Sequence, residues 1–344
     1  RQALILDFID NNTNAQTQSI REYLTVSLGN DISRMTVIRD IEVLLTNDFI
    51  QKKGLGRSVV YKITPKGTLL SPIDSKIYFE KSPDQRVNTK KTFQQDIFES
   101  MEYLFSAQEF LQLDTINDGY RKRVSALSPT ALRKEFERLT IELSWKSSQI
   151  EGNTYSLIDT EILLRQRKEA EGHKKEEAIM LINHKRAIEY IHENASMFET
   201  LSLRNIEDVH AILIEGLGVT RGLRKNIVGI TGTVYRPLDN EFQVREAMEQ
   251  MIKTINGISH PLWKALVLVL LLSYIQPFED GNKRTARLIG NAILLAYNYC
   301  PLSYRSVDEG EYKKAVLLFY EKNNASMFKK IFVDQFEFAV ENYF

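Results

Sequence analysis

The residues most suited to chemistry lie in one short run, from Gln276 to Arg287. The run holds two carboxylates, a glycine, an amide and three cations: Glu279, Asp280, Gly281, Asn282, Lys283, Arg284 and Arg287. An apolar segment, 262–275, comes directly before it. Side chains of these types at the start of a helix bind a polyphosphate together with its metal ion. A transfer reaction also needs a proton acceptor, and the first position of the run is a glutamine.

Individual residues of the run suit different parts of a polyphosphate and its metal ion. Asp280 precedes the turn and can hold Mg²⁺, which prefers one or two carboxylates together with phosphate oxygens. Gly281 permits a tight turn with positive φ, and the helix that begins near Asn282 offers unpaired N–H groups at the positive end of its dipole. Arg284 and Arg287 occupy neighbouring positions on one helix face and can bind further phosphates.

Two helices must position this run. Residues 262–275 are apolar on nearly every face, which predicts a buried central helix that ends at Pro277. A second helix starts near Asn282 and has apolar residues at helical spacing. Because helical spacing prevails and proline and glycine are scarce, we expect a mainly α chain with a helical bundle over 93–344. Its last helices, which lie within 311–343, suit closure of the bundle or a homodimer contact.

The run resembles the signature of the Fic (Fido) family, His-x-Phe-x-(Asp/Glu)-Gly-Asn-(Gly/Lys)-Arg-x-x-Arg, at every position except the first. The resemblance implies a Fic-type helical bundle with a β-hairpin flap. It also implies a protein adenylyltransferase, which moves AMP from ATP to a hydroxyl of a protein Ser, Thr or Tyr. Asp280 would then hold Mg²⁺, and Gly281 and Asn282 would shape the anion hole. Arg284 and Arg287 would bind the β- and γ-phosphates.

Two further features refine what the resemblance implies. Lys283 joins the nucleotide-binding residues, but most members have glycine there, and lysine occurs in a branch that includes a phosphate-transferring toxin. Phosphate transfer is therefore an alternative to AMP transfer. Segment 228–237 would be the flap that positions the target by strand pairing, with the candidate residues Val228, Gly229, Ile230, Thr231, Gly232 and Thr233. An ordinary surface hairpin would have the same composition.

A second motif lies well before the run, in Ser147-Ser-Gln-Ile-Glu151-Gly152. It matches the inhibitory signature of the same family, (Ser/Thr)-x-x-x-Glu-(Gly/Asn), and implies an inhibitory helix near 134–152. By resemblance, Glu151 pairs with Arg287 and keeps the γ-phosphate from its productive place. A carboxylate satisfies the same guanidinium fork as a phosphate does. A lone glutamate at a helix end is otherwise an ordinary surface charge.

Gln276 stands where the family has the histidine that accepts a proton from the attacking hydroxyl. An amide is not basic near neutral pH, and loss of a general base costs about 10²–10⁴ in rate. His260 cannot replace it, because it lies at the far end of the same predicted helix. Two functions therefore stay open. The chain is either an adenylyltransferase restrained by Glu151 or a non-catalytic nucleotide sensor that regulates transcription.

Residues 1–70 resemble a winged helix of bacterial repressors, with three predicted helices followed by a basic hairpin with glycines at its tip. A probable N-cap, Ser33, starts the third helix. Candidate DNA contacts on that helix and the hairpin are Arg34, Thr36, Arg39, Lys52, Lys53 and Arg57. Winged helices also serve as protein contacts or dimerisation modules, so DNA is one of two possible partners. Residues 71–92 read as a linker without a sustained helical period.

The composition is that of an ordinary globular protein, with 344 residues and equal numbers of basic and acidic residues, 45 each. Any affinity for nucleic acid must therefore come from a local patch. The only cysteine, Cys300, rules out a disulfide within the chain and fits a reducing compartment. The longest apolar run, 265–272, is too short to span a membrane. We expect a cytoplasmic protein without a membrane partner.

Overall fold

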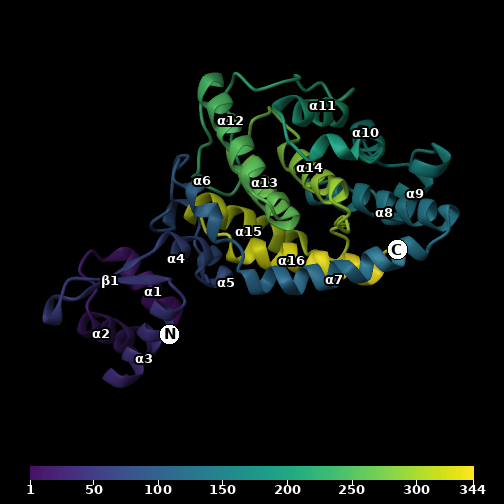
Figure 1. Cartoon of the computed structure of the whole chain (residues 1–344). Coiled ribbons are helices and arrows are strands. Elements are labelled where there is room, and N and C mark those ends of the chain that lie inside the picture. The colour runs from purple at the N-terminus through teal and green to yellow at the C-terminus, as the bar shows by residue number, and fades with distance from the viewer.

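The computed structural model describes the backbone of residues 1–344 and their side chains except that of Arg57. The chain is mainly helical, as predicted. A small N-terminal unit stands at one end of a large helical bundle (Figure 1). One apolar core lies inside the small unit, and a separate, larger core fills the bundle.

The N-terminal unit consists of three helices followed by a two-stranded antiparallel sheet. Its elements are α1 (Gln2–Asn11), α2 (Thr17–Leu28), α3 (Arg34–Thr46), β1 (Ile50–Lys53) and β2 (Val60–Ile63). The predicted N-cap of α3 is confirmed, since the Ser33 hydroxyl accepts the backbone N–H of Thr36 at 3.1 Å. In the sheet, Ile50 pairs with Ile63. This is the element order predicted for a winged helix, and its binding function stays a prediction.

The segment predicted as a linker packs against the bundle. It follows α4 (Pro65–Leu70) and contains α5 (Ser75–Glu80), a helix that the sequence, without a sustained helical period there, did not predict. The Asp74 carboxylate caps α5 by accepting two backbone N–H groups, and the Tyr78 hydroxyl donates to the Glu321 carboxylate at 2.7 Å. A side-chain cap and a contact distant in sequence stabilise a helix that is too short to show a period.

The remaining helices form the bundle (Figure 1). They are α6 (Ile97–Ser100), α7 (Ala107–Ala126), α8 (Pro129–Ile150), α9 (Leu157–Gln166), α10 (Lys175–Glu193), α11 (Leu203–Leu213), α12 (Glu241–Gly257), α13 (Pro261–Ile275), α14 (Asn282–Ala296), α15 (Glu309–Lys322) and α16 (Ser326–Asn342). α7 and α16 run side by side along one edge. Among the described residues, none of the helices has both the length and the apolar character needed to cross a bilayer.

α13 is the buried central helix that its uniform apolarity predicts. Its residues from Ala265 to Leu272 are at most 2% exposed. After a loop of residues 276–281, α14 packs along α13, and Gly290 sets their separation. A Cβ atom at Gly290 would lie only 2.9 Å from Cγ2 of Val269. Close packing of these two helices fixes both ends of the loop 276–281, which belongs to the run 276–287.

The β-hairpin predicted for residues 228–237 is not present as a strand ladder in the described structure. The segment is an irregular loop with a turn at Thr231–Gly232, and a single bridge joins Arg236 to Thr92. Gly229 and Gly232 offer one reason, because glycine lacks a side chain for cross-strand packing and loses more entropy in a strand. We call residues 228–237 the flap below.

We predict that Gly290→Ala destabilises the fold by about 1–3 kcal/mol, because the added methyl group overlaps the stiff side chain of Val269. Urea unfolding monitored by circular dichroism measures the change. Gly257→Ala is the control, since a Cβ atom at Gly257 meets no atom within 4 Å. Equal stabilities of the two variants would contradict close packing of α13 on α14.

Candidate functional site

The loop between α13 and α14 is held in shape by its own residues. Gln276 ends α13 in a left-handed conformation, with φ 52°, and Gly281 starts α14 with φ 78°. The Asn282 side chain closes the loop, since it accepts the N–H of Phe278 and donates to the carbonyl of the same residue, each at 2.8 Å. This closure presents the N-terminus of α14, with its first N–H groups, to the space outside.

His210 on α11 supports the same loop. Its ring stacks on Phe278 with centroids 3.7 Å apart and planes 8° apart. Nε2 lies 3.0 Å from the carbonyl oxygen of Asp280, which can only accept, so Nε2 carries the proton. Burial disfavours the imidazolium and lowers the pKa of His210 to about 4. The ring is therefore neutral at physiological pH. No motif marked His210 in the sequence.

Arg284 is buried at the start of α14 and only partly neutralised. The residue is 2% exposed, and its Nη2 pairs with the Asp280 carboxylate at 3.1 Å. Nη1 is buried and has no hydrogen-bond partner among the described residues. Burial also lowers the pKa of Arg284. Because an unsatisfied buried donor is costly, this guanidinium favours a further anion beside it.

Arg287, one turn further along α14, is fully buried and surrounded by partners. Nε donates to the Ser147 hydroxyl at 3.0 Å, and Nη1 donates to the Tyr312 hydroxyl at 3.3 Å. Nη2 donates to the Ser147 carbonyl at 2.8 Å and to the Glu151 carboxylate at 3.0 Å. Burial opposes the charge, but Tyr312 and Glu151 outweigh burial and raise the pKa of Arg287. The ion pair predicted between Glu151 and Arg287 is therefore present.

Glu151 follows the last residue of α8 and bridges two cations of α14. Its Oε1 pairs with Arg287, and its Oε2 pairs with Lys283 at 3.1 Å. Burial would raise the pKa of Glu151, yet the attraction of Arg287 and Lys283 prevails and lowers it. Gly152 comes next with φ 99°, a conformation that favours glycine. The motif at 147–152 thus contacts the run 276–287 through Glu151. The sequence predicted the contact with Arg287 but not the one with Lys283.

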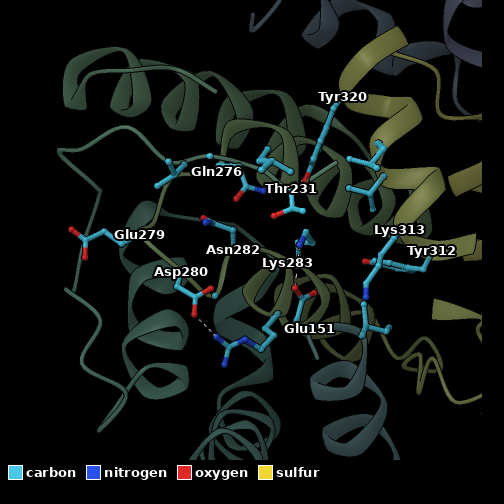
Figure 2. Close-up of a pocket in the computed structure, with 18 residues that line it drawn as sticks. Glu151, Thr231, Gln276, Glu279, Asp280, Asn282, Lys283, Tyr312, Lys313 and Tyr320 are labelled. Atoms are coloured by element: carbon cyan, nitrogen blue, oxygen red, sulfur yellow. Dashed lines mark hydrogen bonds and ion pairs between the residues drawn. The ribbon is translucent and has the colours of Figure 1, made fainter. Parts of the chain in front are cut away.

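A cavity of ≈ 420 Å³ lies between the end of α8, the flap, the start of α14 and α15. Figure 2 shows Gln276, Asn282 and Lys283 around it, with Glu151 beside Lys283. The flap residues that line it are Val228, Gly229, Ile230 and Thr231. Of the residues predicted for the nucleotide site, the inhibitory motif and the flap, five lie outside this lining in the described structure: Ser147, Gly152, Gly232, Thr233 and Arg287. Arg287 sits behind Glu151, so the cavity meets Arg287 only when that carboxylate moves.

The Gln276 side chain is fixed by hydrogen bonds. Its Nε2 donates to the carbonyl of Ser273 at 2.6 Å and to the hydroxyl of Tyr320 at 3.1 Å. An amide held in this way supplies no proton acceptor of useful strength. His184 is also buried, and burial together with the nearby arginines lowers its pKa well below the ordinary value. Neither His184 nor His210 is among the described residues that line the cavity.

Arg224 joins the flap to the loop, and sequence reasoning missed it. Its Nε donates to the Gln276 carbonyl at 2.6 Å. Its other nitrogens donate to the carbonyls of Asn226 and Leu238, at the two ends of the flap. Burial lowers the pKa of Arg224. The three hydrogen bonds of its guanidinium all go to backbone carbonyl oxygens. The base of the flap and the first residue of the run are therefore held by one side chain.

A magnesium ion fits this site only together with a phosphate. The Asp280 side chain is 65% exposed, and its carboxylate pairs with Arg284 at 3.1 Å. Within the described residues, nowhere do three or more His, Cys, Asp or Glu side chains gather to form a metal cluster. Mg²⁺ is commonly bound by one or two carboxylates when phosphate oxygens complete its coordination shell. The Asp280 carboxylate could therefore contribute to a Mg²⁺ site only if phosphate oxygens supplied the other ligands.

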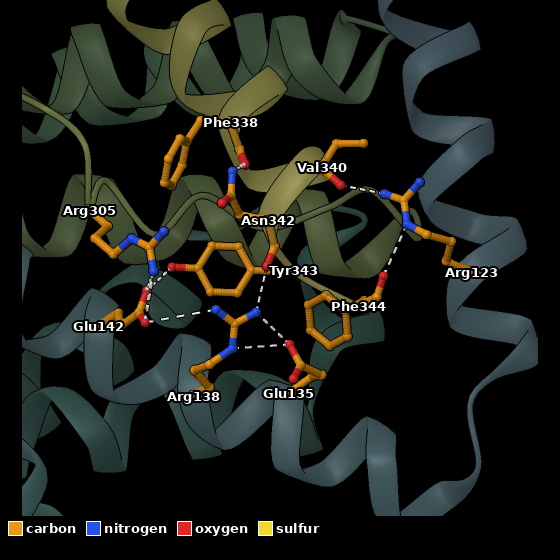
Figure 3. A network of polar contacts seen from close by, with 10 residues as sticks. All are labelled: Arg123, Glu135, Arg138, Glu142, Arg305, Phe338, Val340, Asn342, Tyr343 and Phe344. Carbon is orange, nitrogen blue, oxygen red and sulfur yellow. Dashed lines mark hydrogen bonds and ion pairs between the residues drawn. The ribbon is translucent and has the colours of Figure 1, made fainter.

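A polar network fixes α8 to the C-terminal end of the chain (Figure 3). The Glu142 carboxylate on α8 accepts two hydrogen bonds from Arg305 at 3.1 Å and one from the Tyr343 hydroxyl. Arg138 on the same helix donates to the carbonyl of Asn342. These contacts attach the middle of α8, the helix that Glu151 directly follows, to the C-terminal end of the chain.

The candidate DNA contacts lie in the N-terminal unit, apart from the cavity. Arg34 and Arg39 on α3 and Lys52 and Lys53 on β1 are exposed, whereas Thr36 is half-buried beside Ser33. The side chain of Arg57 lies outside the described residues. Exposure of these cations is compatible with phosphate contact, and DNA binding stays a prediction.

Comparisons with known proteins agree with this geometry. Residues 200–294 match the model of the Fic/DOC family. "Protein adenylyltransferase Fic" of Drosophila persimilis is 29% identical over 192 residues, which are 54% of this chain and 37% of that protein. The same protein of Drosophila mojavensis is 27% identical over 202 residues, 57% of this chain and 40% of that protein. The chain thus spans well under half the length of these relatives.

Solved structures share the fold. A Fic domain containing signaling protein from Bacteroides thetaiotaomicron superposes with a TM-score of 0.55 at 23% identity, over 66% of this chain and 92% of that chain. Fic-1 from C. elegans superposes with a TM-score of 0.57 at 20% identity, over 71% of this chain and 79% of that chain. At these identities the likeness is one of fold.

We predict that His210 makes the protein sensitive to acid. Because its folded pKa of about 4 lies below the ordinary 6.5, the unfolded chain binds more protons and stability falls as pH drops through this window. Between pH 7.5 and 5.5 the loss attributable to His210 is about 1 kcal/mol. Urea unfolding at both pH values measures it against His210→Gln, which retains a donor and does not titrate. The same pH dependence in both proteins would contradict a neutral His210.

Proposed function

We propose that this chain, which belongs to the Fic/DOC family through residues 200–294, binds ATP with Mg²⁺ in the cavity at the start of α14 and is restrained there by Glu151. The observation that carries the proposal concerns the buried Arg287. Its Nη2 donates to the carboxylate of Glu151, a residue of the chain itself. A phosphate matches the same donor. Nucleotide binding therefore competes with Glu151.

Several groups would hold the nucleotide. The N–H groups at the start of α14 and its dipole favour phosphate. Arg284 has a buried nitrogen without a partner among the described residues, and Lys283 and Arg287 become available when Glu151 leaves. Asp280 would hold Mg²⁺, which when bound would neutralise phosphate charge. The family resemblance implies roles for Asp280, Arg284 and Arg287, and the positions of these side chains around the cavity support them.

The reaction inferred from the relatives is transfer of AMP to a hydroxyl of a protein Ser, Thr or Tyr. In that step the hydroxyl oxygen would bond to the α-phosphorus, pyrophosphate would leave, and the hydroxyl proton would need an acceptor. Gln276 offers none of useful strength, because an amide is not basic near neutral pH. Its amide nitrogen donates to Ser273 and Tyr320, which fixes the side chain. We therefore propose that this chain, with glutamine at 276, binds ATP and transfers AMP slowly or not at all.

The second candidate is a non-catalytic nucleotide sensor, which the hydrogen-bonded Gln276 favours. In this function the cavity would report ATP to the N-terminal unit, with DNA or a protein as its partner. Incubation with Mg²⁺ and ATP labelled at the α-phosphate separates the candidates, since label on protein supports AMP transfer. Calorimetric binding without label supports sensing, and label from the γ-phosphate alone supports phosphate transfer.

We predict that Glu151→Gly raises the affinity for ATP with Mg²⁺ about tenfold, because Arg287 and Lys283 lose a competing carboxylate. Isothermal calorimetry measures the dissociation constant. The control is Glu161→Gly, which removes a glutamate that pairs with Arg165 at the surface. Unchanged affinity in Glu151→Gly would overturn the inhibitory role of Glu151.

We predict that Gln276→His combined with Glu151→Gly restores labelling by about 10²–10⁴-fold over Glu151→Gly alone, the range that a general base contributes. Histidine tolerates the left-handed backbone of residue 276 better than most residues do. The readout is the rate of α-phosphate label appearing on protein. Gln276→Asn in the same background is the matched control without a base. If the histidine variant stays as silent as the control, the transferase proposal fails.

A further inference from the structure

We propose that Arg86, in the linker before the bundle, is a positioning residue that fixes the tip of the flap and so sets how an acceptor strand meets the nucleotide. The inference rests on the AMP-transfer part of the proposed function, because only a transfer reaction needs an acceptor. Arg86 lies outside the family match of 200–294. The feature therefore belongs to the way this chain joins its N-terminal unit to the bundle.

Arg86 is clamped in a buried cluster against α15. Its Nη1 pairs with the Glu321 carboxylate at 2.9 Å, and the two side chains are 6% and 0% exposed. The guanidinium lies over the ring of Phe79, 4.7 Å from its centroid. The Tyr78 hydroxyl donates to the other oxygen of Glu321 at 2.7 Å. A charge pair with this burial and these partners holds one geometry.

The same nitrogen reaches the flap. Nη1 of Arg86 donates to the carbonyl of Gly232 at 2.9 Å, at the turn that forms the tip of the flap. Gly232 has φ 86°, a conformation in which other residues are strained. Since one nitrogen serves both Glu321 and Gly232, the position of the tip is tied to α15.

Two further contacts hold the flap at its base and at Arg236, and they leave the backbone of residues 228–231, which we call its open arm, without a partner strand among the described residues. The backbone N–H of Arg236 donates to the carbonyl of Lys91 at 2.9 Å, so the linker already covers the returning arm. Arg224 holds the base. Residues 228–231 line the cavity, and within the described structure their backbone N–H and C=O groups make no hydrogen bond inside the chain. Unpaired backbone groups of this kind accept an added strand.

α15 links this clamp to the cavity. Glu321 directly follows Tyr320, whose hydroxyl accepts the amide of Gln276 at 3.1 Å. Tyr320 also lines the cavity, as does Leu317 one turn earlier. The helix that fixes Arg86 is thus the helix that forms the wall next to the reacting position. Through Arg86, the linker places the open arm 228–231 at a set distance from that position.

A spin label on the flap tests the inference in the full-length chain without nucleotide. Thr231→Cys provides an exposed attachment site, and the native Cys300 is buried at 0% exposure. The variant Arg86→Met with Glu321→Gln removes both charges together, so no buried charge is left unpaired. We expect the rotational correlation time of the label to shorten at least about threefold in this variant.

Controls separate positioning from general loosening. A label at the exposed Ser196, far from the linker in sequence, should keep its mobility in every variant. Arg86→Lys should recover at least half of the restriction at residue 231, because an ammonium can also give two donors to the oxygens of Glu321 and Gly232. Unchanged mobility at residue 231 in the charge-free variant, or a lysine variant as mobile as it, would overturn the proposal.

Calorimetry with ATP and Mg²⁺ keeps this inference apart from the proposed function. In Arg86→Met with Glu321→Gln, we expect the dissociation constant to stay within about threefold of the wild type, because the groups at the start of α14 are untouched. Loss of binding in the variant alone would mean that Arg86 supports the whole cavity, which would also overturn the proposal. Loss in the wild type as well would refute the proposed function, while the spin-label result still decides the role of Arg86.

Discussion

The buried guanidinium of Arg287 is the interaction on which the site depends. A charge without solvent must be paired and fully hydrogen-bonded. Ser147 and Glu151 from the end of α8 and Tyr312 from α15 meet that need. Because each partner comes from a segment distant in sequence, satisfying one charge fixes three helices relative to one another. The cavity above Arg287 takes its shape from this arrangement.

The same requirement explains how the site could be both restrained and responsive. In the proposed function, Glu151 and a phosphate would compete for one guanidinium, so release of the carboxylate and entry of an anion would be parts of one exchange. The network around Glu142 holds the middle of α8 in place. In the proposed exchange, the turn at Glu151–Gly152, where a positive φ follows the helix, is the part that would have to move. A small local change suffices, and the bundle need not rearrange.

Sequence patterns predicted the parts of the molecule that neighbouring residues determine. The apolar helix and the turn at Gly281 follow from residue types and spacing, whereas the pairing of Glu151 with Arg287 was implied by the resemblance to the Fic family. His210, Arg224 and Arg86 escaped prediction, because their roles depend on contacts between distant segments: Arg86 and Glu321 are 235 positions apart. The β-hairpin predicted for the flap was wrong for a related reason. Its composition suits strands, but composition does not show whether a neighbouring segment completes a ladder.

Gln276 has a backbone that is fixed independently of its side chain, by Arg224 at its carbonyl and by the end of α13 at its N–H. A change of side chain there need not disturb the loop. Glutamine and histidine codons differ only in their third base, so the scaffold stands one nucleotide substitution away from carrying a base at this position. A lineage with this architecture could therefore lose and regain a base at this position repeatedly, while the loop, the cavity and the pairing of Glu151 with Arg287 stay unchanged.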